Sequence, residues 1–164
     1  MKRDTGKIVG RDQCVVDLAG LRSLLEVQSQ PDRFAEKLSC FLEMCFRLAE
    51  LSTCKRARVG AMLLSPNLAE VYALGYNGPA TGLPNESCTG EVGACGCVHA
   101  EANALVKATG WGVLFTTTSP CLGCAKLIAN SRRVIAIVSS TEYRDPSGRD
   151  VLSKAGIKQY VHAV

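Results

Sequence analysis

Hydrophobic positions along the first half of the chain follow a helical period and then an alternating one. In the longest helical stretch, apolar residues recur every three or four positions behind Asp32, whose side chain suits an N-cap. The turn sequence Ser-Pro-Asn at 65–67 separates two short apolar runs, as expected for a β-hairpin. The predicted elements are helices at 17–28 and 32–51 and strands at 59–64 and 71–76.

A long loop and a regular alternation of helices and strands fill the second half. The loop, 77–96, is rich in Gly, Pro, Asn and Thr, and loops of this length in a compact domain are commonly functional. Hydrophobic periodicity then predicts helices at 98–108, 121–131 and 149–155 and strands at 113–117, 134–139 and 158–164. Helices that alternate with strands after a hairpin predict an α/β fold, layered on one sheet.

Length and composition fit one domain. A chain of 164 residues, 47% hydrophobic and 21% charged, can bury one core and is short for two ordinary domains. We expect 33–164 to form this domain and 1–32 to be an N-terminal extension, to which the sequence assigns no role.

Charge and hydropathy argue against several classes of protein. The net charge of +4 is dispersed, with short basic clusters at 55–58 and 132–133, and suits small anions better than long nucleic-acid tracts. No apolar run reaches the roughly 18–20 residues of a membrane helix or resembles a signal peptide. We expect no membrane partner and a cytoplasmic location. In a reducing compartment, nine cysteines indicate metal or catalytic sites rather than a disulfide framework.

Two predicted helices begin with metal-binding side chains. The sequence CGCVHAEANAL at 95–105 places His99 at the start of one, and TTTSPCLGCAKLI at 116–128 places Cys121 and Cys124 at the start of another. A catalytic Zn²⁺ takes three protein ligands, thiolate and imidazole among them, and keeps a fourth position for water. Spacing of i, i+3 puts both sulfurs on one face of a first helical turn, where the helix dipole lowers thiolate pKa values. We therefore predict a catalytic zinc site at His99, Cys121 and Cys124.

Glu101 follows His99 by two residues and is the predicted catalytic residue. It is too close to His99 in sequence to be a comfortable fourth ligand but is well placed to contact a metal-bound water as a general base. Taken alone, a CxxC pair also occurs as a redox centre or as half of a structural zinc site. A noncatalytic zinc-binding module in which Glu101 is incidental is the alternative from another functional class.

Several segments together resemble one enzyme family. The order H-x-E followed by P-C-x-x-C is the signature of zinc-dependent nucleobase deaminases. From about Phe34 to Tyr160, the segments STCKRARVGAML, GYNGPATGLP, CVHAEANAL, TTTSPCLGCAKLI and EYRDPSGRDVLSKAGI resemble deoxycytidylate (dCMP) deaminases, including phage versions. Enzymes that edit cytosine in nucleic acid and tRNA adenosine deaminases share the signature and match the other segments less well. The stretch 102–119 is shorter than the family leads us to expect by roughly two helical turns, so we expect a trimmed connection at the pocket edge.

The resemblance implies a fold and a reaction. The fold is the cytidine-deaminase-like three-layer α/β/α sandwich with a central mixed sheet of about five strands. The reaction is hydrolysis of dCMP to dUMP with release of ammonia, which feeds thymidylate synthesis. Zinc lowers the pKa of a water that attacks C4, and Glu101 carries protons from that water to N3 and to the leaving ammonia.

The resemblance also implies contacts with the substrate. The Ala100 amide would bind the base carbonyl, the Ser119 carbonyl would receive the amino group, Asn77 would contact the sugar and Tyr143 would lie near the base. Basic side chains beside the first strand and after the fourth are candidates for the phosphate, and the sequence does not choose among Lys55, Arg56, Arg58 and Arg144.

Other cysteines point to a second metal site. The family often carries a structural zinc, and four thiols make a closed tetrahedral site of that type; the corresponding residues are Cys54, Cys88, Cys95 and Cys97. The alternative is that Cys54 is simply buried and the loop cysteines are reduced and unliganded. Cys14, Cys40 and Cys45 look unrelated to this group, and we expect Cys40 and Cys45 to pack in the core or at its edge.

The family further implies assembly and regulation. Its members often form hexamers, so we expect a homo-oligomer. They respond to dCTP and dTTP, bound with Mg²⁺, through a region that contains GYNG, here Gly75, Tyr76, Asn77 and Gly78. The presence of this motif does not by itself establish regulation.

Other substrates for the same chemistry stay open. These are dCTP, a modified dCMP or another cytosine or adenine nucleotide, and nucleic acid. Nucleic acid is disfavoured because one Trp, four Phe and four Tyr do not form the stripe of basic and aromatic side chains that binds single strands.

Overall fold

The computed structural model describes residues 17–25, 27 and 30–164 of the protein, where helices and strands follow the predicted order. The elements are α1 (Leu18–Leu24), α2 (Pro31–Ala49), β1 (Gly60–Leu64), β2 (Val71–Tyr76), the 3-10 turn η1 (Asn85–Ser87), α3 (Ala100–Lys107), β3 (Gly112–Thr118), α4 (Leu122–Ser131), β4 (Val134–Thr141), α5 (Ser147–Lys154) and β5 (Lys158–Val161).

The start of α2 differs from the prediction. Gln30, not Asp32, is the N-cap, and Pro31 occupies the first helical position. Proline suits that position because the first amide of a helix has no intrahelical partner, and Asp32 in the first turn still meets the positive end of the helix dipole. The predicted cap was wrong by two residues for this reason.

The strands form one mixed sheet in the order β2-β1-β3-β4-β5. β1 runs antiparallel to β2 and to β3, and β3, β4 and β5 run parallel to one another. Parallel neighbours need a crossover, which α4 provides between β3 and β4 and α5 provides between β4 and β5. The predicted hairpin is the antiparallel pair β1 and β2.

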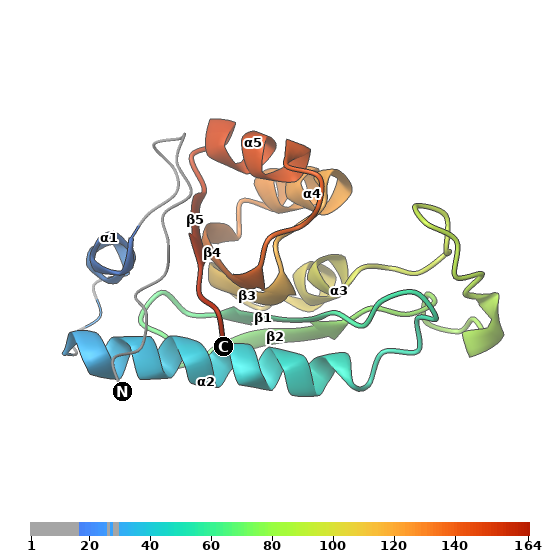
Figure 1. The fold of residues 1–164 in the computed structure, drawn as a ribbon, viewed down its shortest axis with the longest axis horizontal. Coiled ribbons are helices and arrows are strands. Elements are labelled where there is room, and N and C mark those ends of the chain that lie inside the picture. Colours follow the sequence, from blue (N-terminus) through green and yellow to red (C-terminus); the bar gives the residue numbers. More distant parts are fainter. Residues whose placement is uncertain (1–16, 26, 28–29) are drawn as a thin grey trace.

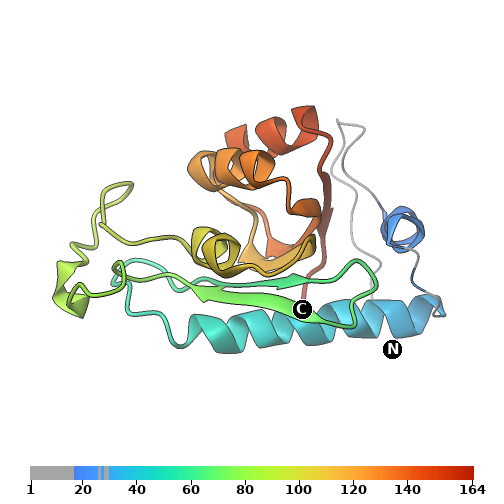
Figure 2. The same ribbon diagram turned by 180° about the vertical axis from the view of Figure 1, so that it is seen from behind.

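Helices cover both faces of the sheet, as Figures 1 and 2 show. Alternate residues of each strand point to opposite faces, so Met62 and Phe115 pack with Leu42 of α2, whereas Leu63 packs with Ile128 of α4 in a second core cluster. One layer contains α1 and α2, and the opposite layer contains α3, α4 and α5. The result is the predicted three-layer α/β/α arrangement.

The N-terminal segment contributes to the core where it is described. Leu21 and Leu25 are buried in the same cluster as α2. The predicted boundary between 1–32 and 33–164 falls in the first turn of α2, and the division stays a prediction. None of the helices described combines the length and apolar character that crossing a bilayer needs.

Gly75 allows the backbone of α3 to lie directly on β2. A Cβ added at this position would overlap the Ala100 carbonyl oxygen and lie 2.7 Å from the Ala104 amide nitrogen. Because Ala100 is the first residue of α3, this contact fixes the helix that begins after His99.

We expect Gly75→Ala to lower the free energy of unfolding by about 1–3 kcal/mol, since the added methyl group must push α3 from the sheet. Urea unfolding followed by circular dichroism measures this change. Val106→Ala is the control on α3, because Val106 is 80% exposed and we expect a change within about 0.5 kcal/mol. Equal urea midpoints of unfolding for Gly75→Ala and the wild type would contradict the close packing of α3 on β2.

Candidate functional site

Three predicted zinc ligands meet where two helices begin. His99 is the N-cap of α3, Cys121 is the N-cap of α4, and Cys124 lies in the first turn of α4. The His99 Nδ1 atom is 3.4 Å from the sulfur of Cys121 and 3.4 Å from that of Cys124. The structure thus brings together one imidazole nitrogen and two thiols from segments more than twenty residues apart in sequence.

The spacing of these atoms suits zinc. Zn–S bonds of about 2.3 Å and Zn–N bonds of about 2.0–2.1 Å at a tetrahedral angle separate N and S ligand atoms by about 3.5 Å. The ligand atoms of the three residues all lie within 4.8 Å of one another. Three protein ligands leave a fourth tetrahedral position, which is the arrangement of catalytic rather than closed structural sites.

The two thiols differ in how readily they ionise. Hydrogen bonds with Cys124 and His99 lower the pKa of Cys121 to about 3 although burial opposes ionisation. The pKa of Cys124 is raised, first by its hydrogen bond to Cys121 and then by burial. Within the pair, the surroundings therefore favour ionisation of Cys121 over that of Cys124, and the hydrogen bond with Cys121 raises the pKa of His99. A cation bound between them would favour both thiolates.

Glu101 lies in the first turn of α3 and is only 4% exposed. Burial raises its pKa above the usual carboxyl range, while its own backbone amide, the charge of His99 and a hydrogen bond with Cys124 oppose this shift. A buried carboxyl in contact with the metal-binding side chains can both accept and donate protons near neutral pH. Its position fits the predicted general base.

Four further thiols form a second cluster. Their sulfurs lie within 4.8 Å of one another, and the cluster contains Cys54, Cys88, Cys95 and Cys97. A tetrahedral zinc with four sulfur ligands separates the sulfurs by about 3.8 Å, and the sulfurs of Cys54 and Cys88 are 3.9 Å apart. Gly96 has φ of 76°, a conformation that glycine adopts freely and that lets its two neighbours turn toward one point.

Backbone amides stabilise one thiolate of this cluster. Burial opposes ionisation of Cys54, but hydrogen bonds from the amides of Ala57 and Arg56 and from Cys97 and Cys88 lower its pKa to about 7. The pKa of Cys97 is raised, mainly by burial. The four thiols fit a closed zinc site in number, spacing and donor type.

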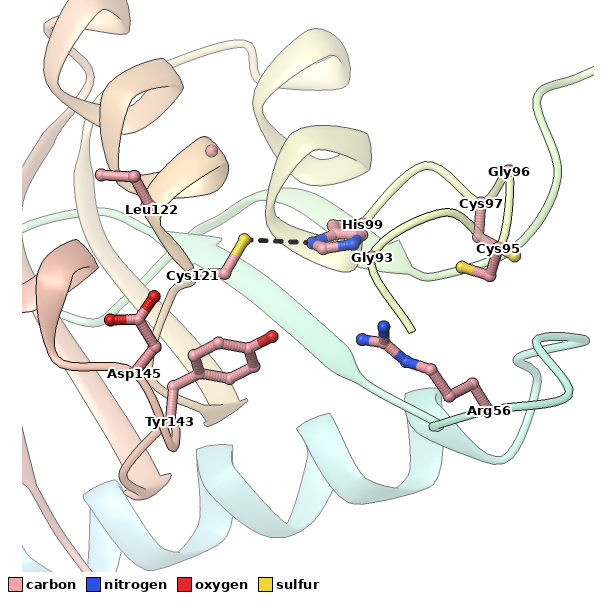
Figure 3. A pocket seen from close by; sticks show the side chains of 11 residues that line it. Arg56, Gly93, Cys95, Gly96, Cys97, His99, Cys121, Leu122, Tyr143 and Asp145 are labelled. Atoms are coloured by element: carbon pink, nitrogen blue, oxygen red, sulfur yellow. Dashed lines mark hydrogen bonds between the residues drawn. The ribbon is translucent and has the colours of Figure 1, made fainter. Parts of the chain in front are cut away.

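A pocket of about 280 Å³ opens beside His99 and Cys121 (Figure 3). It receives side chains from the 50–59 connection, from the long loop, from α4 and from the segment after β4. The pocket is lined by Arg56, Gly93, Cys95, Gly96, Cys97, His99, Cys121, Leu122, Gly123, Tyr143 and Asp145. Its volume is at the small end of ligand sites, which suits one small molecule.

The four predicted substrate contacts differ in their surroundings. Tyr143 lines the pocket, and its amide donates to the Ser119 hydroxyl at 2.7 Å. Ala100 is fully buried and Ser119 is partly buried beside Cys121. Asn77 is buried, and its side chain already accepts from the Val59 amide at 2.8 Å and donates to a backbone carbonyl. Their roles toward a substrate stay predictions.

Among the predicted basic candidates, Arg56 lies at the pocket. It is partly buried and its guanidinium points toward the space between His99 and Tyr143 (Figure 3). Lys55 and Arg58 are exposed, and neither they nor Arg144 line the pocket. Sequence reasoning could not choose among these residues because each has a cationic side chain and the sequence does not show which of them reaches the pocket. It also missed Asp145 and Leu122, although Leu122 lies between the two cysteines predicted to bind zinc.

The GYNG segment has structural roles of its own. Gly75 supports α3, and Gly78 pairs with Val98 through two backbone hydrogen bonds. Asn77 joins the end of β2 to the connection between α2 and β1 through its bonds with Val59 and Ala57. Tyr76 is 40% exposed. An effector site at Gly75, Tyr76, Asn77 and Gly78 stays a prediction.

Two remaining cysteines lie on α2, apart from both clusters. Cys45 is buried, and burial raises its pKa to about 12, as expected for a core thiol. Cys40 is exposed, so the prediction that it packs in the core or at its edge was wrong. Its position on α2 turns it away from the stripe of buried residues. Cys14 lies outside the described residues.

The short connection at 102–119 contains most of α3, four residues between helix and strand, and β3. Among the described residues, none of those that line the pocket comes from this connection. The residues of this connection therefore form no part of the pocket wall, and a shortened connection stays a prediction.

Comparison with known protein families and curated relatives gives consistent matches. Residues 35–140 match the family described as the cytidine and deoxycytidylate deaminase zinc-binding region. The deoxycytidylate deaminase of Schizosaccharomyces pombe is 34% identical over 152 residues, which is 80% of this chain and 46% of that protein. The enzyme of the same name from Mycobacterium phage D29 is 36% identical, over 56% of this chain and 84% of its own. This chain spans less than half the length of its yeast relatives.

Among solved structures, this chain is similar to a phage enzyme of the same kind as these relatives. The dCMP deaminase of cyanophage S-TIM5 in its apo form superposes with a TM-score of 0.64 at 30% identity, over 77% of this chain and 97% of the phage chain. The same phage enzyme in complex with dCMP and dUMP superposes with a TM-score of 0.62.

Proposed function

Because the chain belongs to the cytidine and deoxycytidylate deaminase family, whose zinc-binding region it matches over residues 35–140, we propose that it hydrolyses dCMP to dUMP and ammonia. Its mixed five-stranded sheet with helices on both faces is the fold of the phage dCMP deaminase. The observation that carries the proposal is a buried glutamate beside a His-Cys-Cys zinc set, at a pocket of about 280 Å³. The phage relative, matched over 93% of its length, binds dCMP and dUMP.

The side chains divide the chemistry between them. A zinc ion held by His99, Cys121 and Cys124 supplies Lewis-acid activation of a water molecule. Glu101 would accept one proton from this water as its oxygen attacks C4 and would pass that proton to N3. It would then take the second proton from the new hydroxyl on C4 and deliver it to the amino group as the C4–N bond breaks and ammonia leaves. The raised pKa of Glu101 supports this role, because a carboxyl that acts in both directions needs a pKa closer to neutrality.

We also propose how the rest of the nucleotide is held. The Ala100 amide and the Ser119 carbonyl would contact the two exocyclic groups of the base, and Asn77 would contact the sugar through its remaining amide hydrogen. Tyr143 lies on the pocket wall and would contact the base. The pocket supports a mononucleotide better than an oligonucleotide because it is small and has one basic side chain among its lining residues.

Arg56 is our choice for the phosphate. Arg56 is partly buried and lines the pocket, and a partly desolvated arginine binds phosphate more strongly than a fully solvated one. Arg144 instead stacks on Tyr143, 5.8 Å from the ring centre.

We expect Arg56→Ala to raise KM for dCMP by about 10- to 100-fold, the value of a charge-assisted hydrogen bond, and to leave deoxycytidine kinetics within about threefold. Steady-state ultraviolet assays measure the kinetic constants for dCMP and for deoxycytidine. Added salt should weaken the binding of dCMP more than that of deoxycytidine, because it screens the charge of the phosphate. Arg58→Ala is the control, because Arg58 is exposed nearby and outside the pocket. An equal loss of kcat/KM for dCMP and for deoxycytidine would show that Arg56 does not bind the phosphate.

Three further properties rest on the resemblance. We propose a second, structural zinc at Cys54, Cys88, Cys95 and Cys97, supported by the number and spacing of their sulfurs. Regulation by dCTP and dTTP with Mg²⁺ is proposed at the GYNG segment. A homo-oligomer, a hexamer by resemblance, is supported by exposed apolar side chains on the edge strand β2, Val71, Leu74 and Tyr76.

A further inference from the structure

The four-thiol cluster joins two separate segments, and each of them also supplies a residue to the pocket. Cys54 belongs to the connection between α2 and β1, two residues before Arg56. The other three thiols belong to the long loop between β2 and α3, whose Cys97 lies two residues before His99. Figure 3 shows Cys95 and Cys97 on the same side of the pocket as Arg56.

The loop is fixed to the fold at its base. Gly78 and Val98 exchange two backbone hydrogen bonds, of 3.2 and 2.8 Å. Beyond this pair, the backbone hydrogen bonds of 79–97 run within the loop, for example from the Thr89 amide to the Cys95 carbonyl at 3.1 Å. Leu83 and Val92 are 56% and 64% exposed, so the loop has little apolar core of its own.

This loop contacts the segment that contains Arg56 in two places. At its base, the Asn77 side chain donates to the Ala57 carbonyl at 2.7 Å and accepts from the Val59 amide at 2.8 Å. Farther along the loop, sulfur atoms make the contacts. The Lys55 amide donates to the Cys88 sulfur at 3.4 Å, and the sulfurs of Cys88 and Cys54 are 3.9 Å apart. Lys55 directly precedes Arg56 in the chain. The backbone next to Arg56 is thus held by the thiol cluster, in addition to the contacts of Asn77.

We propose that the four-thiol cluster is a positioning element of the catalytic pocket, which holds Arg56 where its guanidinium meets the substrate phosphate. The inference rests on the proposed function, because it assumes a nucleotide monophosphate at this pocket. The cluster contacts no reacting atom and acts through Arg56. A long, flexible arginine side chain binds strongly only when its backbone is fixed, since each side chain that becomes ordered on binding costs conformational entropy.

Cys88→Ala is the variant that tests this role. Cys88 is fully buried and does not line the pocket, so its loss removes one sulfur without changing the pocket surface. We expect loss of about one zinc per chain, since three ligands remain in a site built for four. We also expect KM for dCMP to rise about tenfold or more, with kcat within about threefold and deoxycytidine kinetics nearly unchanged. Metal analysis and paired steady-state assays measure these changes.

A double-mutant cycle separates positioning from general loss of structure. If the cluster acts through Arg56, adding Cys88→Ala to Arg56→Ala will change KM for dCMP by less than about twofold, because the contact is already absent. Full additivity of the two effects would overturn the proposal. Cys40→Ala, at an exposed cysteine outside both clusters, is the control and should retain wild-type zinc content and kinetics.

Hydrogen exchange of the wild-type protein gives a second test that depends on no variant folding. Binding of dCMP should slow exchange in both 54–58 and 88–97, and deoxycytidine should not, because only dCMP provides a phosphate for Arg56. Slower exchange in 54–58 alone would contradict the proposed link between Arg56 and the four-thiol cluster.

Failure of the inference can be told from failure of the proposed function. Equal wild-type kcat/KM for dCMP and deoxycytidine would remove the phosphate site and the inference with it. A wild-type preference for dCMP that survives in a folded Cys88→Ala protein depleted of one zinc would overturn the inference alone.

Discussion

Replacement of Glu101 by Gln is expected to lower kcat for dCMP by at least about 10²- to 10⁴-fold, the usual contribution of a positioned acid–base group. The amide is nearly the same size as the carboxyl and cannot take a proton from the attacking water. Because Glu101 is predicted to lie outside the metal ligand set, the variant should keep the zinc content of the wild type. Ultraviolet assays and metal analysis on the same preparation give both values.

Asn103→Ala is a control on the same helix. Its side chain donates to the Tyr76 carbonyl at 2.8 Å, so the change removes one hydrogen bond of α3 without touching the zinc set. We expect kcat within about tenfold of the wild type, because loss of one exposed hydrogen bond costs about 1 kcal/mol. Activity of Glu101→Gln near the wild-type value would exclude Glu101 as the general base.

Replacement of His99 by Ala is the second change with a large expected effect. It removes the nitrogen that lies 3.4 Å from both thiols of the catalytic set, and two cysteines alone rarely hold zinc tightly. We expect loss of about one of about two zinc ions per chain and activity below detection. Inductively coupled plasma mass spectrometry counts the metal, and the assay with dCMP measures activity.

The location of the lost zinc distinguishes the two sites. Thermal stability should fall less in His99→Ala than in Cys88→Ala, because a structural zinc's binding energy is also folding energy. His162→Ala is the control for histidine replacement, since the His162 side chain contacts Ser39 at 2.8 Å and belongs to neither cluster. A single zinc per chain in fully loaded wild-type protein would show that the four thiols bind no zinc. Unchanged zinc content in His99→Ala would show that His99 is not a zinc ligand.

The elements of the fold could be read from the sequence because its periodicities are strong. Alternating residues such as Met62 and Leu63 point into two different cores, and each core takes an apolar side chain, so the buried strands read as continuous apolar runs. The start of α2 was misread because Asp32 is a good cap by type, whereas the proline before it already occupies the first helical position. Element ends depend on such local competition.

The meeting of the candidate zinc ligands was predictable and the pocket wall was not. His99, Cys121 and Cys124 have few uses at helix starts other than metal binding or redox chemistry, so residue type and spacing grouped them before any contact was known, and the structure places them together. Arg56 has the same chemistry as Arg58, and only the fold places one at the pocket and the other in solvent. The link between the four thiols and Arg56 likewise depends on contacts between segments more than thirty residues apart.

The most direct test of the central claim is a deamination assay that compares dCMP with CMP, dCTP, deoxycytidine and a cytosine-containing oligonucleotide. Loss of cytosine absorbance should occur with the highest kcat/KM for dCMP, with one ammonia released for each dUMP formed and with loss of activity when zinc is removed. Conversion of the oligonucleotide in preference to dCMP would contradict the account in favour of nucleic-acid editing, and no deamination of any cytosine substrate by the zinc-loaded protein would contradict it altogether.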